Sequence, residues 1–321
     1  METTTRIIDS NGIKMHITEA GQGPLVILCH GFPELGYSWR HQLSALAEAG
    51  YHAVAPDQRG YGKTECPESI ESYKIFDLVG DMVGLVHALG EDKAVLAGHD
   101  WGSPVAWNCA LLRPDLFHAL ILLSVPYAQR TWTGIPPTAG MQKMAGDKHF
   151  YMVYFQEPGK VEKELEEDVR KTIVSTLYSL SGDAPPEDRW KFAFDKGQRF
   201  MDTAPMPAAL PGWITEKDID VFTEAFQRTG FRGGVNWYRN IDRNWALTPF
   251  LSGARISQPS LFIAGEMDGV IAFSRSAFDR LEQTMPNLKE KVLIPGAGHW
   301  IQQERPREVS DRMIQFLRDI A

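Results

Sequence analysis

The chain has few cysteines and lacks any hydrophobic run long enough to cross a bilayer. Its 321 residues include three cysteines, at positions 29, 66 and 109. An odd number of widely spaced cysteines argues against a disulfide framework and favours reduced thiols. No apolar run reaches the about 18 residues that a transmembrane helix requires, and residues 1–6 lack the apolar core of a signal peptide. We therefore expect a cytoplasmic protein without a membrane partner.

A basic excess and metal-binding motifs are also missing. Lysine and arginine together number 33, against 41 for aspartate and glutamate, which gives a formal net charge of −8 at pH 7. This balance, with no basic run, argues against a nucleic-acid partner. Neither an HExxH nor a CxxC pattern occurs, so we expect no metal. The 43% share of hydrophobic residues is enough for a large core in one domain with an insertion.

Short buried segments alternate with amphipathic ones in the two end portions of the chain. The expected strands lie at residues 13–17, 25–29, 52–56, 93–97, 119–123, 260–264 and 291–294. Apolar residues at helical spacing follow several of them, for example over residues 75–89. Strands that alternate with helices predict an α/β fold with a mostly parallel, doubly wound sheet.

The pattern changes in the middle of the chain. Short buried strands disappear there, and helical segments at 161–180 and 215–227 are separated by stretches rich in proline and glycine. The acidic run 162–168 is typical of a solvated helix face. The expected domains are a core made of residues 1–128 and 246–321 and an inserted helical cap made of residues 129–245.

Residues 98–102, Gly-His-Asp-Trp-Gly, have the form of a nucleophile elbow, with Asp100 where serine is usual. The segment follows an expected strand and precedes a helical pattern, as such an elbow requires. Its glycines can adopt the strained backbone angles of so sharp a turn. Aspartate is an anion at neutral pH, so it can attack without a base. Attack on a saturated carbon leaves an alkyl ester that activated water can cleave, so we expect an sp3 electrophile.

Two later loops supply the rest of a catalytic set. An acid follows the strand at 260–264, and His299 follows the last strand, in the order nucleophile, acid, histidine. Glu266 competes with Asp268 for the role of acid, and we prefer Asp268 because it lies deeper in the loop. The backbone N–H groups of Phe32, after the second strand, and of Trp101 are expected to form an oxyanion hole.

Six segments spread along almost the whole chain carry a family resemblance. They are His-Gly-Phe-Pro-Glu at 30–34, Asp-Gln-Arg-Gly-Tyr-Gly at 57–62, the elbow at 98–102, Tyr-Phe-Gln-Glu-Pro-Gly at 154–159, Asn-Trp-Tyr-Arg at 236–239 and Gly-His at 298–299. Together they resemble the soluble epoxide hydrolases of the α/β-hydrolase superfamily. Dehalogenases share the first segment and the elbow, whereas the two segments of the expected cap are more specific.

The resemblance implies an α/β-hydrolase fold that converts a small apolar epoxide and water to a vicinal diol without a cofactor. It also implies that Tyr151 and Tyr238 project from the cap, because the ring-opened oxygen is strongly basic and a phenol of pKa near ~10 can protonate it. Tyr154 and Tyr178 are then packing residues. Contacts with the substrate are expected from Phe32, Pro33, Trp101 and Trp300.

Two other functions stay open. A haloalkane-type dehalogenase would use the same aspartate but needs N–H donors for the halide, commonly from an Asn or Trp side chain, and the side chain of Phe32 offers none. A fluoroacetate enzyme would have arginine in place of Trp101. A hydrolase-fold receptor would bind a ligand without turnover, and fold analogy alone does not decide activity. The complete nucleophile, acid and histidine set argues against a receptor.

Overall fold

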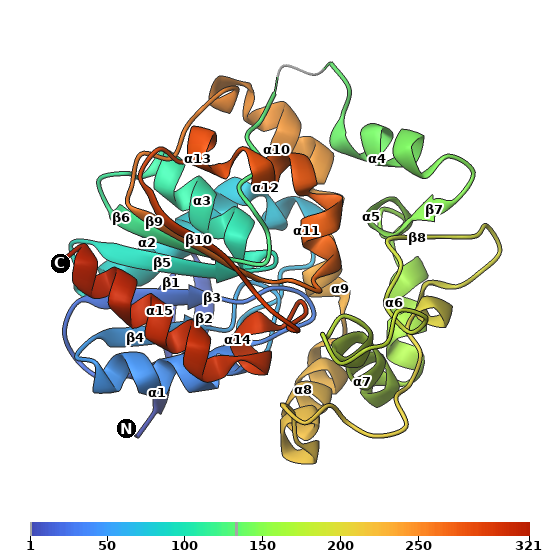
Figure 1. Cartoon of the computed structure of the whole chain (residues 1–321), viewed down its shortest axis with the longest axis horizontal. Helices are drawn as coiled ribbons and strands as arrows, with labels where there is room; N and C mark the ends of the chain where they lie inside the picture. Colours follow the sequence, from blue (N-terminus) through green and yellow to red (C-terminus); the bar gives the residue numbers. More distant parts are fainter. Residues whose placement is uncertain (1, 132–133) are drawn as a thin grey trace.

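The computed structural model describes residues 2–131 and 134–321. Within these residues an eight-stranded sheet has the order β1-β2-β4-β3-β5-β6-β9-β10 (Figure 1). The strands are β1 (Thr4–Ser10), β2 (Ile13–Ala20), β3 (Leu25–Cys29), β4 (His52–Pro56), β5 (Ala94–His99), β6 (Phe117–Leu123), β9 (Ser260–Gly265) and β10 (Leu288–Ile294). The β1–β2 and β2–β4 pairs are antiparallel, and the other pairs are parallel. The mostly parallel sheet predicted from the sequence is therefore confirmed.

The central strands are apolar along their whole length because helices cover both faces of the sheet. Every residue of β3, β5 and β9 is buried, as expected for parallel strands covered on both sides. The helices α2 (Ile75–Ala88) and α3 (Gly102–Leu112) pack on one face, and α1 (Arg40–Glu48) and α15 (Pro306–Asp319) pack on the other. The loops at the carboxyl ends of the strands are left to form a site.

The first strand, β1, lies outside the strands expected from the sequence. It forms a hairpin with β2, and the turn residues Asn11 and Gly12 have φ values of +47° and +77°. Positive φ at both positions of an Asn-Gly pair is characteristic of a type I′ hairpin turn. Most of β1 is exposed, so its hydrophobic pattern is weak. The Asn-Gly pair in the turn is stronger evidence in the sequence for a hairpin at this position.

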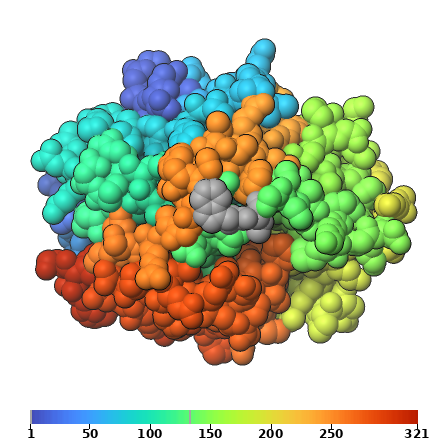
Figure 2. Space-filling view, turned by 90° about the horizontal axis from the view of Figure 1, so that it is seen from above, coloured from blue at the N-terminus to red at the C-terminus, as the bar shows by residue number. Residues whose placement is uncertain are grey.

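Between β6 and β9 the chain forms a mainly helical layer at the carboxyl edge of the sheet (Figure 1). Seen from above, its green and yellow segments lie at one end of the molecule, beside the orange and red segments (Figure 2). Its helices are α4 (Pro137–Ala145), α5 (Tyr151–Tyr154), α6 (Lys160–Glu167), α7 (Val169–Ser179), α8 (Glu216–Thr229), α9 (Arg232–Arg239) and α10 (Ile241–Leu247). A short ladder of β7 (His149–Phe150) and β8 (Ala193–Phe194) lies where no strand was expected. The cap limits, 129–245, stay a prediction.

The single helix expected at 161–180 is in fact two helices, α6 and α7. Between them Asp168 has an extended backbone, with φ of −149° and ψ of 91°. Its carboxylate accepts a hydrogen bond from the backbone N–H of Lys171 at 2.9 Å. An aspartate in this position caps the helix that follows it. The hydrophobic periodicity alone predicted a single helix because it does not reveal the cap at Asp168, which separates α6 from α7.

The remaining elements are short and lie mostly in loops. They are α11 (Gly269–Phe273), α12 (Arg275–Asp279), α13 (Leu281–Thr284), α14 (Ile301–Glu304) and the 3-10 turns Gly36–Trp39, Ile70–Tyr73, Phe200–Thr203 and Pro249–Leu251. In the part of the chain that the structure describes, no helix combines the length and the apolarity that a membrane span needs.

Candidate active site

Asp100 lies in a turn that requires glycine on both sides. It connects β5 to α3 and has a φ of +49°. A Cβ atom at Gly98 would lie 2.2 Å from the carbonyl oxygen of Gly102, and a Cβ atom at Gly102 would lie 2.0 Å from that of Cys29. Neither position accepts a side chain. The turn therefore lifts the Asp100 carboxylate beyond the sheet edge, into a cavity that it lines.

The backbone N–H of Phe32 donates a hydrogen bond to Asp100 Oδ1 at 2.9 Å. The two loops approach this closely because residue 31 is glycine, where a Cβ atom would lie 2.3 Å from Asp100 Cβ. If Asp100 forms an ester, one carboxylate oxygen becomes the carbonyl oxygen that takes up negative charge during hydrolysis. The Phe32 N–H is placed to stabilise that charge. The same role for the Trp101 N–H stays a prediction.

His299 reaches Asp100 from the loop after β10. Its Nε2 lies 3.6 Å from Asp100 Oδ2, and its Nδ1 lies 3.2 Å from Asp268 Oδ2. Asp268 is buried and Glu266 is exposed, so the structure brings the preferred acid to the histidine. Burial alone would lower the pKa of His299, but the carboxylates of Asp268 and Asp100 outweigh burial and raise this pKa well above its ordinary value.

A buried network that the sequence did not predict connects these loops. Glu34 accepts hydrogen bonds from Gly31 N at 2.8 Å and from Gln302 Nε2 at 2.9 Å, and it lies 2.6 Å from His99 Nδ1. His99 Nε2 in turn lies 2.7 Å from the carbonyl oxygen of His299. Burial would raise the pKa of Glu34, but the charge of His99 and its hydrogen bond hold it below its ordinary value. The network fixes the Phe32 loop, the elbow and the His299 loop relative to one another.

Tyr151 and Tyr238 line a cavity with Asp100 from the helical layer. Both are buried, both line a cavity that also contains Asp100, and their ring centres are 5.9 Å apart. Burial and then the charge of Asp100 raise the pKa of Tyr151 well above its ordinary value, and burial does the same for Tyr238. Tyr154 and Tyr178 instead donate hydrogen bonds to Glu164 and Asp188. The structure therefore brings together the two tyrosines that the resemblance implies, and not the other two.

Comparison with known proteins identifies the family. A family model described as the alpha/beta hydrolase fold matches residues 24–306. The chain is 47% identical to epoxide hydrolase A of Mycobacterium tuberculosis, over 98% of this chain and 97% of that protein. The chain belongs to the epoxide hydrolases.

Solved structures agree with this assignment. An epoxide hydrolase from an endophytic Streptomyces superposes with a TM-score of 0.96 at 46% identity, over 99% of this chain and 96% of that chain. Epoxide hydrolase A from Mycobacterium thermoresistibile gives a TM-score of 0.93 at 46% identity, over 99% and 98% of the two chains. The chain is thus an enzyme that hydrolyses epoxides, as the cap segments predicted from the sequence.

The site of this epoxide hydrolase opens in two directions from Asp100. One cavity has a volume of about 540 Å³, and its apolar wall includes Trp101, Pro104, Trp107, Leu111, Met141 and Trp245. The other has a volume of about 40 Å³ and is lined in part by Phe32, Pro33, Leu165, Trp190 and Phe200. Asp100 and Tyr151 line both cavities. A substrate at Asp100 therefore meets a wide apolar space on one side and a narrow one on the other.

Trp300 does not contact either cavity, which corrects the expectation that it binds substrate. Its side chain is 0% exposed, and its Nε1 donates a hydrogen bond to the carbonyl oxygen of Leu177 at 2.9 Å. His299 directs its side chain toward Asp100, and the next residue of this loop points away into the packing between core and cap. Trp300 supports the loop that carries the histidine.

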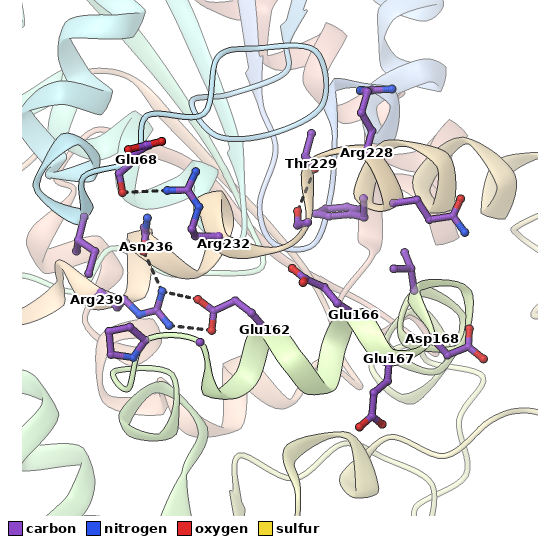
Figure 3. Close-up of a pocket in the computed structure, with 17 residues that line it drawn as sticks. Glu68, Glu162, Glu166, Glu167, Asp168, Arg228, Thr229, Arg232, Asn236 and Arg239 are labelled. Atoms are coloured by element: carbon purple, nitrogen blue, oxygen red, sulfur yellow. Dashed lines mark hydrogen bonds and ion pairs between the residues drawn. The ribbon is translucent and has the colours of Figure 1, made fainter.

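Arg239 holds the tyrosine-bearing segments of the epoxide hydrolase together. Its Nη1 lies 2.6 Å from Glu162 Oε1, and the two side chains are 4% and 10% exposed (Figure 3). Its other nitrogens donate to the carbonyl oxygens of Phe155 and Glu157, both at 3.1 Å. Arg239 therefore ties α9, which carries Tyr238, to the segment that follows α5. Glu162 is a buried partner, which corrects the interpretation of the acidic run 162–168 as a solvated helix face.

A further cavity, of about 930 Å³, lies on the Arg239 side of α9 and is lined mainly by charged and polar residues (Figure 3). It contains none of the residues that face Asp100. Arg232, in its wall, donates hydrogen bonds to the carbonyl oxygens of Pro67 and Glu68. Asp100 lines both of the smaller, apolar cavities and does not line this one.

Replacing Arg239 by lysine should slow ring opening more than ester hydrolysis. Lysine keeps the positive charge beside Glu162 but cannot make the planar set of bonds to two carbonyl oxygens. Both tyrosines should then shift, and misplacement of this kind slows a reaction about ten- to a hundredfold. Arg228→Lys, an exposed change in the wall of the same cavity, is the matched control. Rapid-mixing measurement of both half-reactions checks this, and an equal loss in the two would contradict it.

Proposed function

We propose that Asp100 attacks one carbon of the epoxide ring and forms an alkyl ester. The C–O bond of the ring breaks as the bond to the Asp100 oxygen forms, and Tyr151 or Tyr238 gives a proton to the leaving oxygen. A water molecule activated by His299 then attacks the ester carbonyl, and the vicinal diol leaves. The observation that carries this proposal is that Asp100 lies between two phenols from the cap and an imidazole from the core.

The charges of the site suit the first step. Burial would raise the pKa of Asp100, but the hydrogen bond and charge of His299, with the N–H of Phe32, lower it below its ordinary value. The pKa values of the two phenols are raised. At neutral pH the nucleophile is therefore ionised while both acids keep their protons, which is the combination that ring opening needs.

His299 changes its protonation state between the two steps. In the free enzyme, the carboxylates of Asp268 and Asp100 raise its pKa. Ester formation removes the negative charge from Asp100, so the pKa of His299 falls and its imidazole can accept a proton from water. A phenol that has protonated the alkoxide is left as a phenolate. The one proton that His299 releases equals the one proton that this phenolate needs to become a phenol again, so the number of protons is conserved. Asp268 then stabilises the imidazolium that forms again during hydrolysis.

The same arrangement argues against a dehalogenase. A departing halide needs no proton, whereas an alkoxide does, and the groups that face Asp100 from the cap are phenols. The similarity to epoxide hydrolases over the full length of the chain supports the same conclusion. The cytoplasmic location expected from the cysteines stays a prediction.

We further propose a substrate class, an apolar epoxide with one bulky substituent and little or nothing on the second carbon. The cavities of about 540 Å³ and about 40 Å³ on the two sides of Asp100 support this. An apolar wall with a few polar groups binds such a ligand mainly by burying its surface.

A pair of aromatic epoxides tests this substrate class. Styrene oxide carries one phenyl group and trans-stilbene oxide carries two, and we expect kcat/KM to be at least about tenfold higher for the former, the effect of about 1.4 kcal/mol. Thr176→Ala removes atoms from the wall of the narrow cavity and should reduce the difference, whereas Leu111→Ala in the wide cavity should not. Equal values for the two substrates in the wild type would contradict the proposed class.

A further inference from the structure

Ser124 occupies a strained turn at the carboxyl end of β6. Its φ is +68°, and the N–H of Val125 donates to the carbonyl oxygen of Leu123 at 2.8 Å, which closes a three-residue turn around it. This hydrogen bond and a positive φ at the central residue are features of the rare form of the γ-turn. Of the residues that the structure describes, only Asn11, Asp100 and Ser124 have a positive φ without being glycine. Asn11 lies in a hairpin turn, and the other two lie in the active site.

The turn places the Ser124 hydroxyl between His299 and Asp268. Ser124 is completely buried, and its Oγ donates a hydrogen bond to Asp268 Oδ2 at 2.6 Å. The same oxygen lies 2.9 Å from His299 Nδ1, whereas the two carboxylate oxygens lie 3.2 and 3.3 Å from that nitrogen. The hydroxyl is therefore nearer to the imidazole than the carboxylate is. Asp268 Oδ1 is also engaged, because it accepts a hydrogen bond from Val270 N at 2.9 Å.

One consistent set of donors satisfies all these contacts. His299 Nδ1–H donates to Ser124 Oγ, and Ser124 Oγ–H donates to Asp268. This set leaves Nε2 of His299 free to face Asp100 and to take a proton from water. Without the hydroxyl, Nδ1–H would keep only the longer contacts to the carboxylate, and the imidazole plane would be held less firmly.

We propose that Ser124 is a positioning residue for His299, one that passes the hydrogen bond from the imidazole to Asp268. This inference rests on the proposed function, because it assigns Ser124 to the half-reaction in which His299 activates water. Ring opening does not need a base, so Ser124 should matter little to it. Loss of a residue that acts on one half-reaction lowers one of the two rates, whereas loss of a residue that only supports the fold lowers both.

Ser124→Ala should slow ester hydrolysis about tenfold, the effect of one hydrogen bond of ordinary strength, and should leave the rate of ester formation unchanged. Because hydrolysis then limits turnover, kcat and KM should fall together while kcat/KM stays constant. Rapid mixing gives the two rates, and intact-protein mass spectrometry gives the fraction of enzyme held as ester on Asp100.

Ser124→Gly is the matched variant. It also lacks the hydroxyl but removes the strain of a positive φ, so it should unfold at a higher temperature than Ser124→Ala while showing the same slow hydrolysis. Wild-type hydrolysis rates in both variants would overturn the proposal, and so would an equal loss of both half-reactions. Absence of any ester in the wild-type enzyme would overturn the proposed function, and the role of Ser124 with it.

Discussion

Replacing His299 by glutamine should leave ring opening nearly intact and should stop the reaction at the ester. Asp100 is ionised and the phenols supply the acid, so the first step does not require a base. Hydrolysis does require one, and loss of a general base slows a step by about 10²- to 10⁴-fold. Intact-protein mass spectrometry should show almost all of the enzyme with one substrate molecule added, and the adduct should be absent from the Asp100→Asn variant.

His87→Gln, an exposed change on α2, should leave both steps at their wild-type rates, which controls for the general effect of removing an imidazole. A His299→Gln enzyme that turns over normally and carries no adduct would show that another group activates the water.

The Tyr151→Phe and Tyr238→Phe changes should have the second largest effect, this time on the first step. Each removes one oriented donor from the developing alkoxide, which should slow ester formation about ten- to a thousandfold. The double variant should nearly abolish it, because no acid is then left to protonate the oxygen. Trp101, whose ring centre lies 5.1 Å from that of Tyr238, offers a fluorescence signal for the step in rapid-mixing experiments.

Tyr154→Phe and Tyr178→Phe are the matched controls. Their hydroxyls are bonded to Glu164 and Asp188, so these changes should alter stability slightly and ester formation little. A double variant at positions 151 and 238 that forms the ester at the wild-type rate would refute the assignment of the phenols and reopen the dehalogenase reading.

The sequence predicted those parts of the site in which the reactive residue and the residues that shape its backbone turn lie within one short segment. The elbow is such a segment, because Asp100 and its two glycines are local requirements of one turn. Asp268 and His299 could be found because each follows an expected strand closely, Asp268 the buried strand β9 and His299 the edge strand β10. The two tyrosines could be located only through the family resemblance, since a cap tyrosine is ordinarily a packing residue.

The contacts that the sequence did not predict join residues far apart in the chain. Glu162 and Arg239 are separated by 77 positions and Ser124 and His299 by 175, so no local spacing indicates that they meet. The prediction that Trp300 contacts substrate was wrong because closeness in sequence does not ensure closeness in space. Trp300 is adjacent to His299 in sequence, but neighbouring residues of a loop can face opposite sides, and only the packing of the cap on the core decides which side each faces.

A single turnover in oxygen-18 water tests most directly the central claim that Asp100 forms a covalent ester. With enzyme in excess over epoxide, water attacks the ester carbonyl, so the heavy oxygen should enter the carboxylate of Asp100 and the first diol should contain none of it. Peptide mass spectrometry of the segment that contains Asp100, with analysis of the diol, reads both outcomes. A labelled diol and an unlabelled Asp100 would mean that water opens the ring directly, and the covalent mechanism would be wrong.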